Sequence, residues 1–226
     1  MIIEQSIYNS QLSGISGQQI TLRVMETFYS LQGEGFHQGK AAYFIRLGGC
    51  DVGCFWCDVK ESWDEASHQQ KTIEQIIEEA KLLIRPQSIN LDDNPIIVIT
   101  GGEPLLHNLD ELTKSLQQNN FKTHLETSGS SSLSGFWNWI CLSPKKFKEP
   151  LHEVFAAANE LKIIVYNKND FNWAERNAAK VPLTCKLYLQ PEWSKSTQIT
   201  PLIIDYIKAN PQWQLSLQIH KYINVP

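Results

Sequence analysis

The stretch Pro95-Ile-Ile-Val-Ile-Thr-Gly-Gly-Glu-Pro104 decides how the rest of the chain is interpreted. Its first five residues form a short, continuous apolar run, which is typical of a strand buried on both faces of a parallel sheet. The two glycines that follow end the strand in a turn. Parallel strands need long crossover connections, usually helices, so this stretch predicts an α/β domain.

The sequence on both sides of this stretch alternates between strand-like and helix-like segments. We expect further strands at residues 21–29, 41–47, 121–126, 137–142, 161–165, 185–189 and 213–219. The best-defined helix begins at Thr72, where Gln75 completes a capping box, and Pro86 stops it. Asn108 caps a second helix, and others are expected at residues 153–159, 170–179 and 196–209. This order predicts a parallel sheet with right-handed crossovers, either an open doubly wound sheet or a full or partial barrel.

The composition of the chain excludes several protein classes. Its 226 residues are 42% hydrophobic and 19% charged, which excludes intrinsic disorder, collagen-like repeats and coiled coil. The net charge of −4 argues against direct nucleic-acid binding, because such surfaces neutralise phosphates with a basic stripe. Residues 1–20 lack a clear period and are interpreted as an N-terminal extension, and residues 21–226 as one domain.

Targeting signals are not evident in the sequence. The start, Met1-Ile-Ile-Glu4, lacks the basic region of a signal peptide, and no apolar run approaches the roughly 20 residues of a membrane span. Five cysteines make an odd set, and three of them crowd between Cys50 and Cys57, unlike the even, dispersed cysteines of secreted domains. We therefore expect a cytoplasmic protein without a membrane partner.

Small or hydrogen-bonding residues follow six of the predicted strands. They are residues 50–57, 101–104, 127–129, 143–145, 190–191 and 220–221. Because the carboxyl ends of parallel strands meet at one edge of a sheet, these loops predict a single extended pocket.

The most informative of these loops is Cys50-Asp-Val-Gly-Cys54-Phe-Trp-Cys57. Three thiolates at this spacing can wrap a compact iron–sulfur core and leave one iron open, whereas electron-transfer clusters use four cysteines. The alternatives are a structural zinc site, for which His37 is a candidate fourth ligand, or three core thiols. Cys141 and Cys185 stand alone in predicted strands and are interpreted as small core residues.

The cysteine spacing, with Trp56 before the third cysteine, resembles the signature of the radical S-adenosylmethionine (SAM) superfamily. The resemblance implies a [4Fe-4S] cluster on Cys50, Cys54 and Cys57, whose open iron binds the amino and carboxylate groups of SAM. Reduction then yields a 5′-deoxyadenosyl radical. Gly101-Gly-Glu-Pro104 is similar to the second motif of that superfamily, in which Glu103 would pair with the SAM ammonium group.

Further motifs resemble one family of that superfamily, the 7-carboxy-7-deazaguanine synthases. They are Phe28-Tyr-Ser-Leu-Gln-Gly-Glu-Gly35, Phe44-Ile-Arg-Leu-Gly-Gly-Cys50, Glu126-Thr-Ser-Gly129, Leu142-Ser-Pro-Lys145 and His220-Lys-Tyr-Ile-Asn-Val-Pro226. The resemblance implies a contracted, partial parallel β/α barrel, a homodimer, and a flavodoxin or ferredoxin as reductant. It also implies the ring contraction of 6-carboxy-5,6,7,8-tetrahydropterin to 7-carboxy-7-deazaguanine with loss of ammonia. SAM is used catalytically in that reaction, which belongs to 7-deazapurine synthesis of the queuosine type.

The same resemblance assigns roles to individual residues. Substrate contacts are implied for Leu31, Gln32, Gly33, Glu34, Arg46, Thr100, Gly101 and Pro226. Cofactor contacts are implied for Trp56, Asp58, Gly102, Glu103, Ser128, Ser143, Pro144, Lys145 and Gln190. From the residues alone, a lone Arg46 in an apolar strand needs a partner, either the substrate carboxylate or an internal salt bridge.

Pro226 and Val59 carry two further expectations. In the resembled family the end of the chain folds into the pocket, so the carboxylate of Pro226 is expected to accept hydrogen bonds from the pterin. The family commonly has Thr or Ser two positions after the third cysteine, where its hydroxyl helps to bind Mg²⁺, but this chain has Val59. Mg²⁺ would then be held by substrate oxygens and water or by Asp58, or would not be used, and a weaker Mg²⁺ dependence is expected.

Two alternative functions stay open on the sequence. One is another radical SAM enzyme, such as a glycyl-radical activase, which the motif Leu31-Gln-Gly33 and Arg46 disfavour. The other is a non-enzymatic iron–sulfur carrier or zinc-binding module, which would not need the turn at residues 101–104.

Overall fold

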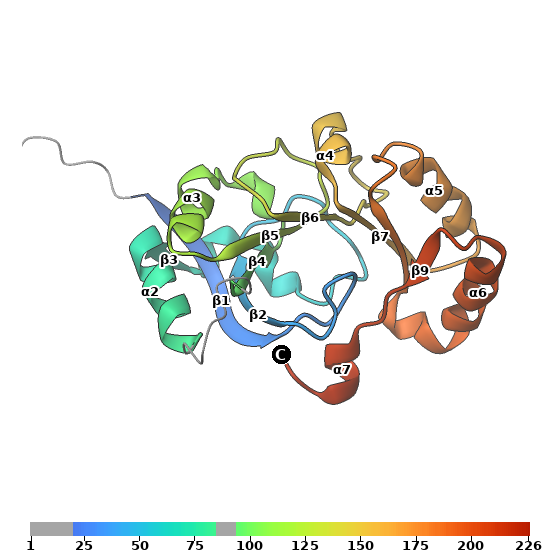
Figure 1. Cartoon of the computed structure of the whole chain (residues 1–226), viewed down its shortest axis with the longest axis horizontal. Coiled ribbons are helices and arrows are strands. Elements are labelled where there is room, and N and C mark those ends of the chain that lie inside the picture. Colours follow the sequence, from blue (N-terminus) through green and yellow to red (C-terminus); the bar gives the residue numbers. More distant parts are fainter. Residues whose placement is uncertain (1–19, 85–93) are drawn as a thin grey trace, which may run out of the picture.

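A nine-stranded sheet runs through residues 20–84 and 94–226, the part of the chain that this computed structural model describes (Figure 1). The strand order across the sheet is β3-β1-β2-β4-β5-β6-β7-β8-β9. β1 runs antiparallel to β2 and β3, while β2 and β4 to β9 are mutually parallel. The strands are β1 (Thr21–Leu31), β2 (Ala41–Leu47), β3 (Gln69–Thr72), β4 (Ile96–Gly101), β5 (Lys122–Thr127), β6 (Trp139–Leu142), β7 (Glu160–Val165), β8 (Lys186–Pro191) and β9 (Trp213–Leu215).

Helices connect the parallel strands and cover the outer face of the sheet. They are α2 (Ile73–Leu83), α3 (Asp110–Gln118), α4 (His152–Ala157), α5 (Asn169–Ala178) and α6 (Ser196–Ala209), followed by the short α7 (Ile219–Ile223). Figure 1 shows the strands in an arc, with α2 to α6 around its outside and α7 at its opening. The edge strands β3 and β9 do not pair with each other in the described residues. The predicted partial barrel is therefore confirmed, and it is not closed.

Alternation of side chains along the strands separates the apolar face beneath the helices from an interior that is polar in β5 and β7. In β7, Leu161, Ile163 and Val165 are fully buried in the core beneath the helices. Lys162 lies between them in sequence and therefore points to the opposite face, toward the inside of the arc. In β5, Leu125 likewise joins the core, while its neighbour Glu126 faces the interior. The functional groups of this protein occupy that interior.

Most of the predicted elements are confirmed to within a few residues. The capping box of α2 is present in both directions, because Thr72 Oγ1 accepts from the Gln75 backbone N–H at 3.2 Å and Gln75 Oε1 accepts from the Thr72 N–H at 2.9 Å. Asn108 Oδ1 accepts from the Asp110 N–H at 2.9 Å at the start of α3. Pro86 and residues 1–19 of the predicted extension lie outside the described residues.

The sequence prediction is wrong at two places. The last strand was expected at residues 213–219, but β9 ends at Leu215 and the chain then turns into α7. As an edge strand, β9 has one neighbour, and the Ile219 N–H bonds instead to the Gly33 carbonyl across the opening of the arc. The strand β3 was not expected, because its sequence Gln-Gln-Lys-Thr has no apolar alternation and it pairs only at the sheet edge.

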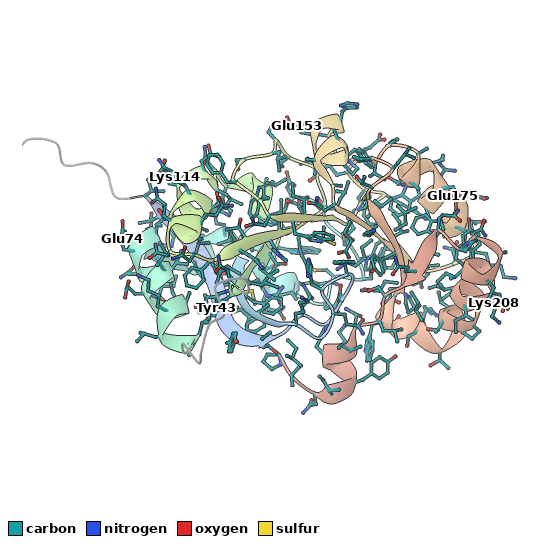
Figure 2. All side chains as sticks on the ribbon, viewed as in Figure 1. Tyr43, Glu74, Lys114, Glu153, Glu175 and Lys208 are labelled. Carbon is teal, nitrogen blue, oxygen red and sulfur yellow. The ribbon has the colours of Figure 1, made fainter. Side chains whose placement is uncertain are left out.

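Figure 2 labels three charged side chains on the helices, Glu74, Lys114 and Lys208, and all three are exposed. Among residues 20–84 and 94–226, no helix combines the length and apolar character that crossing a bilayer requires.

The capping box at Thr72 gives a test of the fold. Replacing Thr72 by Ala removes the side-chain acceptor and should lower the free energy of unfolding by about 1 kcal/mol, whereas Thr72→Ser should preserve it. Chemical denaturation of the two variants beside the wild type measures the difference. Equal stability of Thr72→Ala and the wild type would contradict the cap.

Candidate functional site

The carboxyl ends of β2 and β4 to β8 surround one cavity, here called the central cavity. Five of the six predicted strand-end loops contribute to it. They do so through Cys50, Cys54, Trp56, Cys57, Gly101, Gly102, Glu103, Thr127, Ser128, Ser143, Lys145, Gln190 and Pro191. The parallel strands therefore bring residues that are far apart in sequence to one place, as predicted.

Cys50, Cys54 and Cys57 are free thiols that all line the central cavity. The loop is held by backbone hydrogen bonds from Cys50 N–H to the Trp63 carbonyl at 3.3 Å and from Cys57 N–H to the Cys54 carbonyl at 3.1 Å. Burial raises the pKa of the Cys50 and Cys54 thiols, and at Cys54 the nearby Lys145 opposes that rise. A bound metal centre would compensate the thiolate charge that burial disfavours.

The arrangement of the thiols suits a cluster better than a single ion. No three His, Cys, Asp or Glu side chains within residues 20–84 and 94–226 converge to hold one metal ion. The thiolates of a cuboidal cluster bind different irons, so they need not converge in that way. His37, the candidate fourth zinc ligand, packs instead against His124 and Trp139 at centroid distances of 4.5 and 4.7 Å and does not line the central cavity.

The Gly-Gly-Glu loop after β4 is locked onto the start of the cysteine loop. Gly102 N–H donates to the Leu47 carbonyl at 3.0 Å and Glu103 N–H to the Gly49 carbonyl at 2.8 Å. A Cβ atom on Gly102 would lie 2.2 Å from the Gly49 carbonyl oxygen and 2.8 Å from Cys50 Cβ. Only glycine fits this approach, which explains the residue type at the second position of the motif.

Glu103 is buried, with 1% of its surface exposed, and its carboxylate is fully oriented. Oε1 accepts from Thr127 Oγ1 at 2.5 Å and from the Leu105 N–H at 3.1 Å. Oε2 accepts from the Ser128 N–H at 2.8 Å and from Ser128 Oγ at 2.5 Å. Ser128, assigned to the cofactor from the sequence, therefore also positions the acid that lines the cavity.

Lys145 and Ser143 form a local unit at the end of β6. Lys145 Nζ donates to the Ser143 carbonyl at 2.6 Å and to Ser143 Oγ at 2.7 Å, and burial lowers the pKa of Lys145.

Pro144 lies outside the central cavity. It lines an adjoining aromatic cavity with Phe55, Phe147, Tyr166 and Trp173, and Trp56 and Ile164 line both.

A second cavity, here called the flanking cavity, lies beside the central one. It collects most of the residues that the sequence assigns to the substrate. They are Leu31, Gln32, Gly33, Glu34, Arg46, Thr100 and Pro226. Gly101 lines only the central cavity. Glu34, Asp58, Val59, Thr100, Glu126 and Gln218 line both cavities and form the wall between them.

Arg46 forms an internal salt bridge, one of the two kinds of partner that the sequence left open. Its Nε donates to Glu26 Oε1 at 2.7 Å, and Glu26 is nearly half exposed. Arg46 lines the flanking cavity as well. The guanidinium has further N–H groups, so the contact with Glu26 leaves donors for a second partner.

Lys162 is the main site residue that the sequence analysis missed. It is 4% exposed, and its Nζ forms an ion pair with Glu34 Oε2 and lies 3.5 Å from Glu126 Oε2. Burial alone would raise the pKa of Glu34, but the Lys162 charge and hydrogen bonds from Lys162, Gln218 and Gln190 lower it to about 2. The signal was the one used for Arg46, a single cation inside an apolar strand.

The C-terminal segment closes the opening of the arc. His220 packs on Gly33, where an added Cβ would lie 2.0 Å from His220 Nδ1. Lys221 forms an ion pair with Asp58 on the cysteine loop, and Ser30 Oγ donates to a Pro226 oxygen at 2.9 Å. The tail therefore contacts both the cysteine loop and the loop after β1.

The position at which the family commonly has a Mg²⁺-binding hydroxyl has no side-chain oxygen in this chain. Val59 lines both cavities, and the neighbouring Asp58 carboxylate is paired with Lys221. The residues of this chain do not match the family's usual side-chain ligand.

Comparison with known sequences agrees with this geometry. A model of the radical SAM superfamily matches residues 44–149. A 7-carboxy-7-deazaguanine synthase of Flavobacterium psychrophilum is 51% identical over 205 residues, which cover 91% of this chain and 93% of that protein. The protein of the same name from Escherichia coli strain K12 is 34% identical and covers 89% of this chain and 98% of its own length.

The fold has a solved counterpart. The crystal structure of QueE from Escherichia coli superposes with a TM-score of 0.76 at 31% identity, covering 87% of this chain and 93% of that one. Since sequence and fold agree over nearly the whole length of the chain, it belongs to the 7-carboxy-7-deazaguanine synthase family of the radical SAM superfamily.

Proposed function

We propose that this chain contracts the ring of 6-carboxy-5,6,7,8-tetrahydropterin to give 7-carboxy-7-deazaguanine with loss of ammonia. The observation that carries the proposal is the wall shared by the two cavities, which Glu34, Thr100 and Glu126 line from both sides. The cysteines lie in one cavity and the loop of residues 31–33 in the other. A pterin in the flanking cavity would lie directly beside the cofactor, as hydrogen transfer between them requires.

The family implies a [4Fe-4S] cluster and SAM, and the residues of the central cavity fit both. Cys50, Cys54 and Cys57 would hold the cluster, while Gly102 and Glu103 would face the methionine part of SAM. When bound and supplied with an electron, these groups would provide the radical chemistry that removes a hydrogen atom from a substrate carbon. Glu103 is suited to an ammonium group because its carboxylate is already oriented by Thr127 and Ser128.

The nucleoside part of SAM would extend toward the aromatic cavity. Trp56 lines both cavities and Pro144 the aromatic one, so both would contact a flat ring there. The polar groups left for its sugar and amino acid parts are Ser128, Ser143, Lys145 and Gln190, all in the central cavity.

The chain's own residues would bind and orient the pterin. Gln32 and Glu34 would present an amide and a carboxylate to the hydrogen-bonding edge of the ring, and Leu31 and Gly33 line the same cavity. Arg46 would offer the N–H donors not used by Glu26 to the substrate carboxylate, for which a guanidinium is well suited. The tail that ends at Pro226 would cover the site and exclude water, which protects a radical reaction from other hydrogen donors.

Partners beyond the substrate stay part of this proposal. We expect a flavodoxin or ferredoxin as the electron donor. Phe55, in the cysteine loop, is 59% exposed and offers an apolar surface close to the cluster ligands. A homodimer and a role in queuosine-type 7-deazapurine synthesis are the remaining expectations from the family.

Anaerobic turnover tests the function directly. Reconstituted and reduced wild-type protein, incubated with SAM and the carboxylated tetrahydropterin, should form 7-carboxy-7-deazaguanine, which mass spectrometry detects. Cys54→Ala should lose both the cluster absorption and the product, while Cys185→Ser, outside the site, should keep both. A reconstituted wild type that carries its cluster but forms no product would contradict the assignment.

The end of the chain offers a second test. A peptide tag added after Pro226 should abolish turnover, because Pro226 lines the flanking cavity and contacts Ser30. The same tag before Met1 is the matched control and should leave turnover intact. Equal activity of the two tagged proteins would show that the tail does not contribute to the pocket.

Val59 predicts how the enzyme responds to Mg²⁺. Wild-type turnover should change little when Mg²⁺ is removed by a chelator, because Val59 has no oxygen ligand to offer. Val59→Thr should gain a Mg²⁺-dependent increase in turnover, and Val59→Ala should not. An absolute requirement of the wild type for Mg²⁺ would refute this prediction.

A further inference from the structure

Four residues inside the sheet, namely Gln32, Glu34, Glu126 and Lys162, form a closed circuit of hydrogen bonds and ion pairs, here called the interior network. Lys162 binds Glu34 Oε2 and lies 3.5 Å from Glu126 Oε2. Gln32 Nε2 donates to Glu126 Oε1 at 2.9 Å, and Gln32 Oε1 accepts from the Glu34 backbone N–H at 3.1 Å. From outside the circuit, Gln218 Nε2 donates to Glu34 Oε1 at 2.8 Å.

The interior network lies where the two cavities meet. Glu34 and Glu126 line both the central and the flanking cavity, Lys162 lines the central one, and Gln32 the flanking one. Its members come from three separate parts of the fold, namely the end of β1 with the following loop, β5 and β7. Among the described residues, Lys162 is the cation paired with both carboxylates. Together with the bond from Gln32 to Glu126, it joins the loop after β1 to β5 and β7.

We propose that Lys162 is a positioning residue of the reaction, which holds the carboxylates of Glu34 and Glu126 in register on the wall that faces the pterin. This proposal rests on the proposed function, since it takes the flanking cavity to be the pterin site. Lys162 itself need not touch the substrate. Its effect is exerted through the two carboxylates and through Gln32.

The electrostatic reason is the proximity of two partly buried acids, whose side chains are 15% exposed at Glu34 and 26% exposed at Glu126. Lys162 leaves the pair of carboxylates with one uncompensated negative charge. Without the cation, two partly buried carboxylates on the same wall cannot both stay ionised easily, and one of them takes up a proton at higher pH than usual. At still higher pH both would ionise, repel each other and separate the loop of Glu34 from β5.

Other ionisable groups around Lys162 do not replace it. Glu160 on the same strand and Cys141 on β6 add to the local negative charge when they ionise, and neither supplies a cation. Lys145 is engaged with Ser143, and burial lowers the pKa of His220 near Glu34, which favours the neutral ring. Lys162 is therefore the cation that bonds to both carboxylates in the described part of the chain.

The test measures binding instead of turnover. Reconstituted, unreduced protein with SAM is titrated anaerobically with 6-carboxypterin, an oxidised and unreactive probe that is followed by its fluorescence. Affinities relative to the wild type are determined between about pH 6 and pH 7.5, where a raised carboxyl pKa would fall. Taking the ratio at each pH removes the ionisation of the probe itself.

Lys162→Met should bind the probe about tenfold more weakly at the lower pH, and the loss should grow as the pH rises. Lys162→Arg keeps the cation, so its affinity relative to the wild type should not fall as the pH rises. The same is expected for Lys168→Met, which changes an exposed lysine. The double variant Glu34→Gln with Lys162→Met removes one acid together with the cation. Its affinity relative to the wild type should therefore not depend on pH in this range. This variant keeps the test valid if Lys162→Met alone does not fold.

The possible outcomes distinguish failure of the positioning role of Lys162 from failure of the assignment of the flanking cavity to the pterin. A Lys162→Met protein that binds like the wild type, or more weakly by the same factor at every pH, would overturn the positioning role. So would a double variant whose relative affinity still falls as the pH rises. If the wild type itself did not bind 6-carboxypterin, the assignment of the flanking cavity would fail, and this proposal with it.

Discussion

Side-chain alternation along the strands of an open, curved sheet is the constraint on which the rest of the molecule depends. The outer face is covered by α2 to α6, so the residues that point outward are apolar and fully buried, as Leu161, Ile163 and Val165 are in β7. The residues between them must point inward. Charged groups placed there, such as Lys162, are removed from water and require partners, because an unpaired buried charge costs far more than a paired one. The interior network is the result, and it contributes Glu34 and Glu126 to the wall between the two cavities.

The opening of the sheet shapes the site as strongly as the sheet itself. Since β3 and β9 do not pair in the described residues, the interior is accessible at that side, and two segments fill the space. The loop after β1 enters it, and the tail crosses it, joined by the bond from Ile219 N–H to the Gly33 carbonyl. The ion pair of Lys221 with Asp58 links the tail to the cysteine loop. The flanking cavity is therefore lined by groups from both ends of the domain.

The parts of the site that sequence could predict are those whose signal is local. The spacing of Cys50, Cys54 and Cys57 is contained in one loop, and the glycines before Glu103 follow one buried strand, so both motifs were found without the structure. The capping box at Thr72 is likewise local and is confirmed. Partnerships across the fold were not accessible. Three examples depend on segments that are distant in sequence. Arg46 pairs with Glu26, Pro144 lies outside the central cavity, and Gln218 donates to Glu34.

The amino-acid sequence by itself determined the class of fold, the cluster loop and the family, because periodicity and motif spacing are properties of short segments. It misjudged the last strand and did not reveal β3, since edge strands are decided by the neighbour they find and not by their own pattern. Only the tertiary structure decided that Lys162 joins Glu34 and Glu126, which lie on three separate elements. The physical reason is that the inward or outward direction of a side chain follows from its strand, while its partner follows from how the strands are ordered and how far the sheet curves.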